Sequence, residues 1–453
     1  MSLLRNPVNG PWATFCALAV VLICVLAAPM ARAQTYTDLF NFDDEHGADP
    51  QNPQLLAQGR DGNLYGTAPN GNKGGTVFRF TPDGTPKVLS YFDGINGARS
   101  YSGLTLGTDG DFYGTTFIGG SNRDGTIFRI TPNGSLYRLY NFTSGQSPPS
   151  APPIEAANGD FYGTSGKSAY KLTRGGSFTF LATLPGGSTS PLLQATNGNF
   201  YGTTNSGGTS NNGTVFTMTE QGNITVIFNF DNHVPAFDDP LMQGTDGNFY
   251  GTTYGGGDNK SGIVFKLTPK GVVTALHSFP DPTNPDDGAH PYAGLLQASD
   301  GNFYGVAFEG GSMGYGVIFR ITAAGEYSIL YNFDPATGSN PASTPMQHTN
   351  GTMYGLTEAG GLGDGAAYSF SLGLPPFVRL QPTLGKAGTV IEFLGQGFTG
   401  TTAVSFNGTV TAFTVESDTY LTAIVPTGAT TGVVSVTTPS GVLNSNQAFR
   451  VVP

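Results

Sequence analysis

The sequence is poor in cysteine, tryptophan and charge. Its two cysteines, Cys16 and Cys24, and its only tryptophan, Trp12, all lie before residue 34 of the 453. Charged side chains make up 11% of the chain, and the net charge is −11. An acidic chain without basic clusters binds nucleic acid and anionic membranes poorly. We therefore expect no nucleic-acid partner.

Long hydrophobic runs are also scarce, and the clearest one spans residues 15–28. It follows Arg5, ends at Pro29 and is followed by small residues up to Ala33, which is the arrangement of a cleaved secretory signal peptide. An uncleaved anchor is the alternative, but a membrane-spanning helix needs about 20 apolar residues. We expect residues 1–33 to be removed and the protein to be secreted, or held in the periplasm or cell envelope, with no later membrane span.

Cleavage would leave a mature chain with no cysteine and no tryptophan. Disulfides, thiol catalysis and cysteine-bound metals are then excluded, although the compartment would permit disulfides. Loss of Arg5 and Arg32 would leave 18 basic against 31 acidic side chains.

Glycine is abundant, with 67 residues, and Tyr-Gly pairs mark an internal repeat. They occur at Tyr65, Tyr113, Tyr162, Tyr201, Tyr250, Tyr304 and Tyr354. The spacing of 39 to 54 residues is close to that of a four-stranded propeller blade, about 40–50 residues. The repeat therefore predicts seven blades.

Each unit contains four short segments rich in aromatic and β-branched residues, which is typical of β-strands. The first two are separated by Asp-Gly or Asn-Gly, as in "DGNFYGTT" from Asp246 to Thr253. Such pairs favour two-residue hairpin turns. We interpret the motif as architecture, with Phe249 and Tyr250 packed against opposite neighbouring blades.

The seventh unit lacks its fourth strand, and a matching segment lies just after the signal peptide, from Tyr36 to Asp43. If this strand pairs with the segment near Tyr368, it removes an exposed sheet edge and closes the ring. The predicted fold is all-β: a seven-bladed β-propeller over residues 34–373, closed by an N-terminal strand.

The combination of "YGTT", "GG" and "GTVF" in these units resembles the GloVer tandem repeat of bacterial exported proteins, the group called choice-of-anchor tandem repeat GloVer-containing proteins. The resemblance covers about Tyr36 to Leu372. It implies export and a propeller-like repeat, and it implies no known reaction.

Beyond Pro376 the Tyr-Gly period stops, and short alternating segments predict a small β-sandwich over residues 374–453. "GQGF" from Gly395, "VSFNG" from Val404 and "TTGVVSVTTPSG" from Thr430 resemble the IPT/TIG immunoglobulin-like domain. The resemblance implies a spacer or protein-contact domain.

Candidate binding residues follow from the longer loops, which connect the second strand to the third and the fourth strand to the next unit. In a propeller these loops share one face, and function concentrates on loops. The candidates are Asp43, Asp93, Asp231, Asp281, Asp286, Asp287 and Asp334. These carboxylates either fix the loops as Asx turns or hold Ca²⁺, with Asp286 and Asp287 as the predicted ligands.

The third unit has shortened loops, which predict a notch exposing Lys167, Tyr170 and Thr189. This notch is either a groove through which a ligand enters, or the result of neutral sequence drift in a blade that tolerates shorter loops. Lys167 and Tyr170 join the candidate ligand-binding residues.

Catalytic motifs are not found in the sequence: there is no HExxH, GxSxG or P-loop pattern. His277 is expected to be packed in a strand, and His46, His233 and His290 lie in loops. The sequence favours an exported non-catalytic protein that recognises an extracellular protein or glycan through its loop face. The alternative is a secreted carbohydrate-active or lyase-type enzyme with its site at the channel mouth, formed by carboxylates from different blades.

Overall fold

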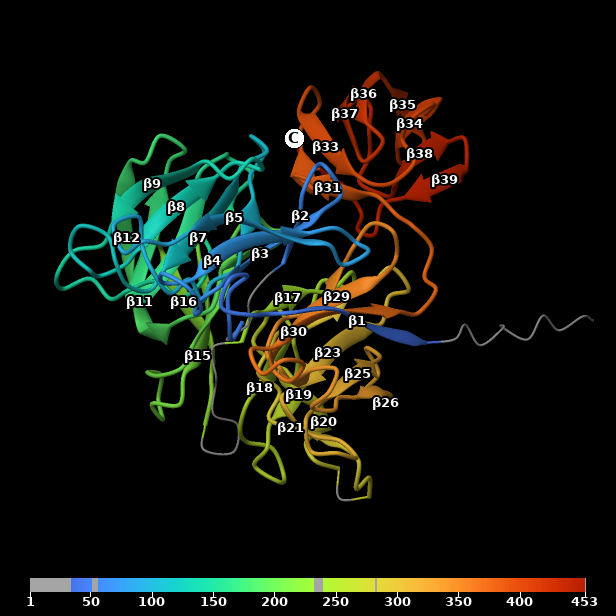
Figure 1. Cartoon of the computed structure of the whole chain (residues 1–453). Helices are drawn as coiled ribbons and strands as arrows, with labels where there is room; N and C mark the ends of the chain where they lie inside the picture. The colour runs from blue at the N-terminus through green and yellow to red at the C-terminus, as the bar shows by residue number, and fades with distance from the viewer. Residues whose placement is uncertain (1–33, 51–55, 232–238, 282, 453) are drawn as a thin grey trace, which may run out of the picture. The chain divides into compact units, whose positions relative to one another are not determined.

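The computed structural model describes residues 34–50, 56–231, 239–281 and 283–452. The predicted signal peptide and His233 lie outside these residues. The described residues contain strands and turns but no helix (Figure 1). The all-β prediction is therefore confirmed for the part of the chain that the structure describes.

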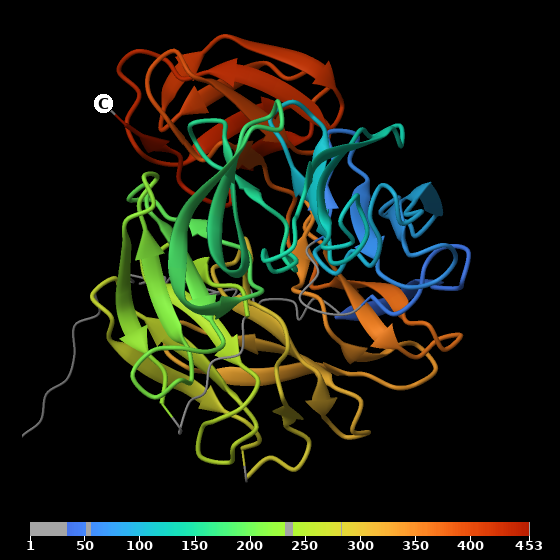
Figure 2. The ribbon, with the colours of Figure 1, turned by 90° about the vertical axis from the view of Figure 1, so that its left-hand side faces the viewer.

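Each Tyr-Gly unit forms its own antiparallel sheet, and successive sheets lie side by side in chain order (Figure 2). The first contains β2 (Ala57–Gln58), β3 (Leu64–Ala68), β4 (Thr76–Phe80) and β5 (Pro86–Tyr91); the second β6 (Thr105–Leu106), β7 (Phe112–Thr116), β8 (Thr126–Ile130) and β9 (Leu136–Asn141); the third β10 (Ile154–Glu155), β11 (Phe161–Leu172) and β12 (Phe178–Ser188). The fourth contains β13 (Leu193–Gln194), β14 (Phe200–Thr204), β15 (Thr214–Met218) and β16 (Ile224–Asn229); the fifth β17 (Met242–Gln243), β18 (Phe249–Thr253), β19 (Ile263–Leu267) and β20 (Val273–Ser278). The sixth contains β22 (Leu296–Gln297), β23 (Phe303–Ala307), β25 (Val317–Ile321) and β26 (Tyr327–Asn332).

The last unit recruits a strand from the start of the chain. Its sheet contains β27 (Ser339–Pro341), β28 (Met346–Gln347), β29 (Met353–Ala359), β30 (Ala366–Ser371) and β1 (Thr35–Asn41). β1 pairs antiparallel with β30, with Asp38 opposite Tyr368, and the two strands run side by side in Figure 1. Phe42, directly after β1, is fully buried and packs against Phe78 of the first sheet, with ring centroids 5.2 Å apart. The predicted pairing of the N-terminal segment is confirmed, and it covers the edge of β30.

The Asp-Gly and Asn-Gly pairs form the turns between the first two main strands of a sheet, but the loop has three residues rather than the predicted two. In the first sheet the N–H of Gly62 donates to Gly59 O (3.0 Å), and the N–H of Gly59 donates to Asn63 O (2.8 Å). Gly62 has a φ of +75°, whereas Asp61 has no positive φ. This is a type I turn followed by a left-handed glycine.

The Phe-Tyr-Gly motif packs neighbouring sheets against each other. Tyr250 stacks on Phe303 of the following sheet, with ring centroids 4.0 Å apart, and Phe249 stacks on Tyr201 of the preceding sheet at 4.1 Å. The Tyr250 hydroxyl donates to the turn residue Asp246 at 2.8 Å. Equivalent ring contacts join Tyr65–Phe112, which is stacked, and Tyr113–Phe161 and Tyr162–Phe200, which are tilted. Each stack adds about 0.5–1.5 kcal/mol beyond its burial, so the motif serves architecture, as predicted.

The two sets of longer loops lie together, as the sequence predicts. The N–H of Gly120, in the loop after β7, donates to Gly94 O in the loop after β5 (2.9 Å). Between the fifth and sixth sheets the same contact is extended into two short strands, β21 (Gly288–Ala289) and β24 (Glu309–Gly310). Gly119 and Gly120 both have positive φ (+86° and +78°), which explains the "GG" of the repeat because glycine adopts this conformation without strain.

The C-terminal residues form two sheets around a separate core. One contains β31 (Arg379–Gln381), β33 (Val390–Leu394), β37 (Tyr420–Ile424) and β36 (Phe413–Ser417); the other β35 (Thr409–Thr411), β34 (Ala403–Phe406), β38 (Val434–Thr438) and β39 (Gly441–Asn444). A short parallel pair, β32 (Leu384–Gly385) and β40 (Arg450–Val451), accompanies them. The shared core includes Phe393, Phe406, Leu421 and Val436, so the inner faces of the two sheets pack on each other.

Candidate functional site

Most loop carboxylates predicted as ligands are used to shape their own loops. Asp93 Oδ1 accepts from the backbone N–H groups of Ile95 (2.9 Å) and Asn96 (2.8 Å). Asp334 accepts in the same way from the N–H groups of Ala336 (2.8 Å) and Thr337 (3.1 Å). These are Asx turns, so the structural interpretation holds for both residues.

Asp43 and Asp231 lie at corresponding positions after a sheet's outer strand. Asp43 Oδ1 lies 2.7 Å from the backbone N and 2.8 Å from the ring Nδ1 of His46. Partial burial raises the pKa of Asp43, but these hydrogen bonds outweigh burial, and the net pKa is lowered. Asp231 is exposed and directly precedes residues that the structure does not describe.

The loop after β20 places its three candidate carboxylates in different environments. Asp281 accepts from the N–H and hydroxyl of Thr283 (2.8 and 2.7 Å), and Asp286 is exposed. Asp287 is buried: its Oδ2 lies 2.9 Å from His277 Nε2 and accepts from the N–H of Asp281 (2.6 Å). Asp287 thus holds the loop to β20, and calcium binding at Asp286 and Asp287 stays a prediction.

The histidines have structural contacts. His277 lies in β20 and is packed as predicted, stacked on Tyr327 of the sixth sheet with ring centroids 3.8 Å apart. Buried His348 places its Nε2 2.9 Å from Gly62 O, and burial lowers its pKa. Across the described ranges, no group of three or more His, Cys, Asp and Glu side chains is arranged to hold a metal ion.

The third sheet corrects one predicted site residue. The two segments predicted as its second and third strands form one continuous strand, β11. Lys167 and Thr189 are exposed as predicted. Tyr170, however, is fully buried rather than exposed. It packs against Gly163 inside the sheet, where an added Cβ would lie 2.3 Å from the Tyr170 Oη. The shortened loops therefore do not uncover this ring, because it belongs to the core between sheets.

An aromatic cluster that sequence reasoning missed lies on the loop face between the fifth and sixth sheets. His290 stacks on Tyr254, with ring centroids 4.5 Å apart, and Tyr254 meets Tyr292 edge-on at 5.7 Å. Tyr292 is 5.7 Å from Phe308. All four rings are partly exposed, and exposed Glu309 follows Phe308. We call these four residues the loop-face aromatic cluster. The sequence signal for this cluster was an aromatic residue directly after the second strand of a unit, as at Tyr254 and Phe308.

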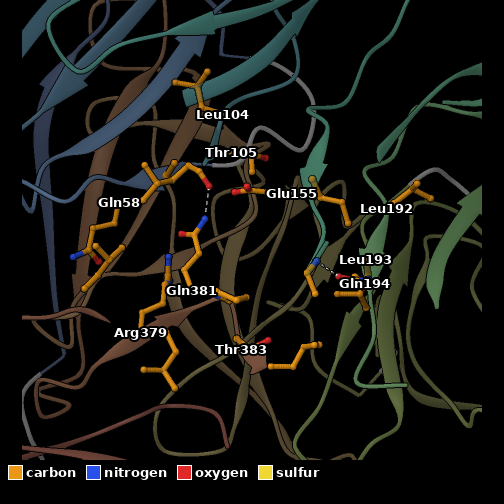
Figure 3. A pocket seen from close by; sticks show the side chains of 18 of the residues that line it. Gln58, Leu104, Thr105, Glu155, Leu192, Leu193, Gln194, Arg379, Gln381 and Thr383 are labelled. Carbon is orange, nitrogen blue, oxygen red and sulfur yellow. Dashed lines mark hydrogen bonds between the residues drawn. The ribbon is translucent and has the colours of Figure 1, made fainter. Parts of the chain in front are cut away.

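Hydrogen bonds between neighbouring sheets mark the opposite face, where the Asp-Gly turns lie. Gln243 Oε1 accepts from the N–H of Thr196 in the preceding sheet (2.9 Å). The same bond to the preceding sheet is made by Gln58, Glu155, Gln194, Gln297 and Gln347. In the second sheet this position is Leu106, which has no side-chain acceptor. There the C-terminal domain supplies a polar contact, because Gln381 Nε2 donates to Leu106 O (2.6 Å; Figure 3).

A cavity of about 400 Å³ lies on this turn face, between the innermost strands of the first four sheets and the segment around β31. We call it the channel-mouth cavity (Figure 3). Its aliphatic lining comprises Leu56, Leu104, Leu106, Ile154, Leu192, Leu193, Leu380, Leu384 and Leu394. Its polar lining includes Gln58, Gln194 and Arg379. Apolar walls with a few polar groups are typical of small-molecule sites.

A second cavity of about 330 Å³ adjoins the first and contains two carboxylates, Glu155 and Glu392. Arg60 Nη2 donates to Glu392 Oε1 at 2.5 Å, and Arg174 is ion-paired with Glu155. Burial raises the pKa of Glu392, and the Glu155 charge raises it further, although Arg60 opposes both. Glu155 belongs to the third repeat sheet and Glu392 to β33 of the C-terminal domain, so the pair does not consist of carboxylates from two blades, and each acid is paired with an arginine.

The family model of the Gloeobacter/Verrucomicrobia repeat matches residues 28–169 and 165–368. The chain belongs to this family. The sequence resemblance to the GloVer repeat is thereby confirmed for the repeat region. No curated protein matches this Gloeobacter/Verrucomicrobia repeat protein.

Solved structures similar to this Gloeobacter/Verrucomicrobia repeat protein support a β-propeller fold. A fungal alcohol oxidase of the AA5 family, in complex with copper, matches with a TM-score of 0.52 and 14% identity, over 93% of this chain and 100% of that chain. Virginiamycin B lyase from Staphylococcus aureus matches with a TM-score of 0.50 and 17% identity, over 75% of this chain and 99% of that chain. At these identities the similarity concerns the fold alone.

Within the described residues, no helix is long and apolar enough to cross a membrane.

Proposed function

We propose that the protein is an exported, non-catalytic glycan-binding protein. Residues 1–33 would be a cleaved signal peptide, residues 34–373 a seven-bladed propeller closed by β1, and residues 374–453 an IPT/TIG-like sandwich. The pairing of β1 with β30 and the two packed C-terminal sheets support this division. Export is tested directly by N-terminal sequencing of the secreted protein, which should begin at Gln34.

The loop-face aromatic cluster carries the proposal. Partly exposed rings of Tyr254, Tyr292 and Phe308 offer flat apolar surface, and exposed Glu309 offers a polar contact nearby, whereas His290 Nδ1 already lies 3.0 Å from Tyr254 O. Aromatic faces with polar groups at their edges suit a sugar ring, which has both apolar and hydroxyl-bearing surfaces. Asp93, Asp281 and Asp334 are less suited to this role, because each accepts hydrogen bonds within its own turn.

The test is a glycan array and a polysaccharide-turnover screen, each with and without EDTA, followed by variants. Tyr292→Ala should weaken binding of the selected glycan by about 2 kcal/mol, or roughly 30-fold, because aromatic residues dominate binding sites of this kind. Tyr137→Ala is the matched control, since Tyr137 is 47% exposed on the outer strand β9. Equal binding by both variants would refute the loop-face site. Loss of binding in EDTA would favour the predicted Ca²⁺ at Asp286 and Asp287.

A second candidate function is the secreted carbohydrate-active or lyase-type enzyme. The observation that favours it is the pair Glu155 and Glu392 in one cavity, where burial raises the pKa of Glu392 as a general acid would require. Products with new reducing ends or unsaturated termini would support this enzyme, provided that Glu392→Gln abolishes them. Saturable binding without turnover would support the binding protein.

A further inference from the structure

Arg379 lies at the channel-mouth cavity without a carboxylate partner. Its Nη2 donates to Gln347 O at 2.9 Å, and its Nη1 lies 3.9 Å from Met346 Sδ. None of the acidic side chains in the described ranges forms an ion pair with it. Both contacts are made to β28, the innermost strand of the last sheet, so the guanidinium is held at the wall of the cavity.

The other charged group at this cavity is already neutralised. Glu155 accepts from the N–H (2.6 Å) and hydroxyl (2.8 Å) of Thr108, and Arg174 is ion-paired with it. Arg379 is therefore the charge in the cavity that lacks compensation. A cation beside apolar walls is costly unless an anion joins it, and the guanidinium fork suits a carboxylate.

The remaining lining sets the shape and polarity of the ligand. Nine leucine and isoleucine side chains surround a volume of about 400 Å³, which is within the range of small-molecule pockets. Exposed Ala157 and Thr383 stand at its rim, so the cavity opens to solvent.

We propose that the channel-mouth cavity binds a small carboxylate with an aliphatic body, whose carboxylate meets Arg379. This site lies on the turn face and is separate from the glycan site proposed on the loop face. The acidic chain as a whole disfavours anions, so specificity comes from this one cation combined with aliphatic walls.

Isothermal titration of the mature chain with octanoate tests the proposal, with octanol as the uncharged probe. We expect saturable octanoate binding and at least tenfold weaker octanol binding. A hydrogen bond to a charged group raises the binding affinity by about 10- to 100-fold. Arg379→Gln should weaken octanoate binding by at least tenfold. Lys386→Gln is the matched control, because Lys386 is an exposed cation of the same domain outside this lining.

Arg379 also holds β28, so unfolding of Arg379→Gln would abolish octanoate binding as well, and Arg379→Lys separates the two causes. Lysine retains the charge, and we expect it to retain more octanoate binding than glutamine while losing the bond to Gln347. The proposal is overturned if the wild-type chain does not bind octanoate, if octanol binds equally well, or if a folded Arg379→Gln binds octanoate as the wild type does. Loss of glycan binding in Tyr292→Ala with octanoate binding intact would separate the two sites.

Discussion

Phe42 offers the sharpest test of ring closure, because it joins the start of the chain to both the first and last sheets. Its side chain is fully buried, with ring centroids 5.0 Å from Phe40 and 5.2 Å from Phe78. Replacing a fully buried phenylalanine by alanine costs about 3–5 kcal/mol through lost transfer energy and the cavity that remains. If β1 closes the repeat region, Phe42→Ala should destabilise all of it rather than a local segment.

Calorimetry gives the measurable size of this effect. With an unfolding entropy of about 2.1 cal/mol/K per residue, the roughly 340 residues of the repeat region give about 0.7 kcal/mol/K, so the midpoint should fall by about 4–7 °C. Phe180→Ala is the matched control, because Phe180 is 55% exposed on β12 and surface changes are usually within about 0.5 kcal/mol. A shift in Phe42→Ala no larger than in Phe180→Ala would refute the closure.

Three further substitutions have defined outcomes. Burial raises the pKa of Asp246, but Lys266 and other hydrogen-bond partners lower it to about 2; its stabilisation is therefore present above pH 4 and lost as the pH falls towards 2. In urea unfolding, Asp246→Asn should lower the free energy of unfolding by less than about 1 kcal/mol at pH 7 and leave it unchanged near pH 2. A loss of the same size at both pH values would contradict this. Tyr170→Phe should raise the free energy of unfolding by about 1 kcal/mol, measured as a higher urea midpoint, because the buried Tyr170 Oη has no hydrogen-bond partner in the described part of the chain. A lower urea midpoint would show that the hydroxyl does have a hydrogen-bond partner. Arg60→Met leaves the Glu392 carboxylate unpaired, so the free energy of unfolding should fall by about 3 kcal/mol at pH 8. The loss should be smaller at pH 5, because burial raises the pKa of Glu392 and protonation removes its charge. A larger loss at pH 5 than at pH 8 would argue against this pairing.

Local sequence predicts the sheets well, because their determinants are adjacent in the chain. The turn at Asp246 and the packing of Phe249 and Tyr250 follow from residue type and alternation, and both agree with the structure. The displaced strand was also predictable, since a missing segment in one unit matched a spare segment at the other end. The predicted turn of two residues was one residue too short, because only the glycine of each Asp-Gly pair, and not the aspartate, takes the left-handed conformation.

The candidate sites were predicted less well. The loop carboxylates were found, but only the folded structure shows that Asp287 is buried against His277 whereas neighbouring Asp286 is exposed. Tyr170 was expected at a notch because its loops are short, yet loop length does not determine where a strand's side chain points.

The sequence by itself determined the repeat, its strands and the strand that completes the last sheet, because hydrogen-bonding turns and alternating side chains act over a few residues. Only the tertiary structure decided that Arg379 meets the channel mouth and that Tyr254, His290, Tyr292 and Phe308 form one cluster. These groups come from segments that are separate in the chain, and their charge and exposure depend on which side chains the packing of sheets places beside them.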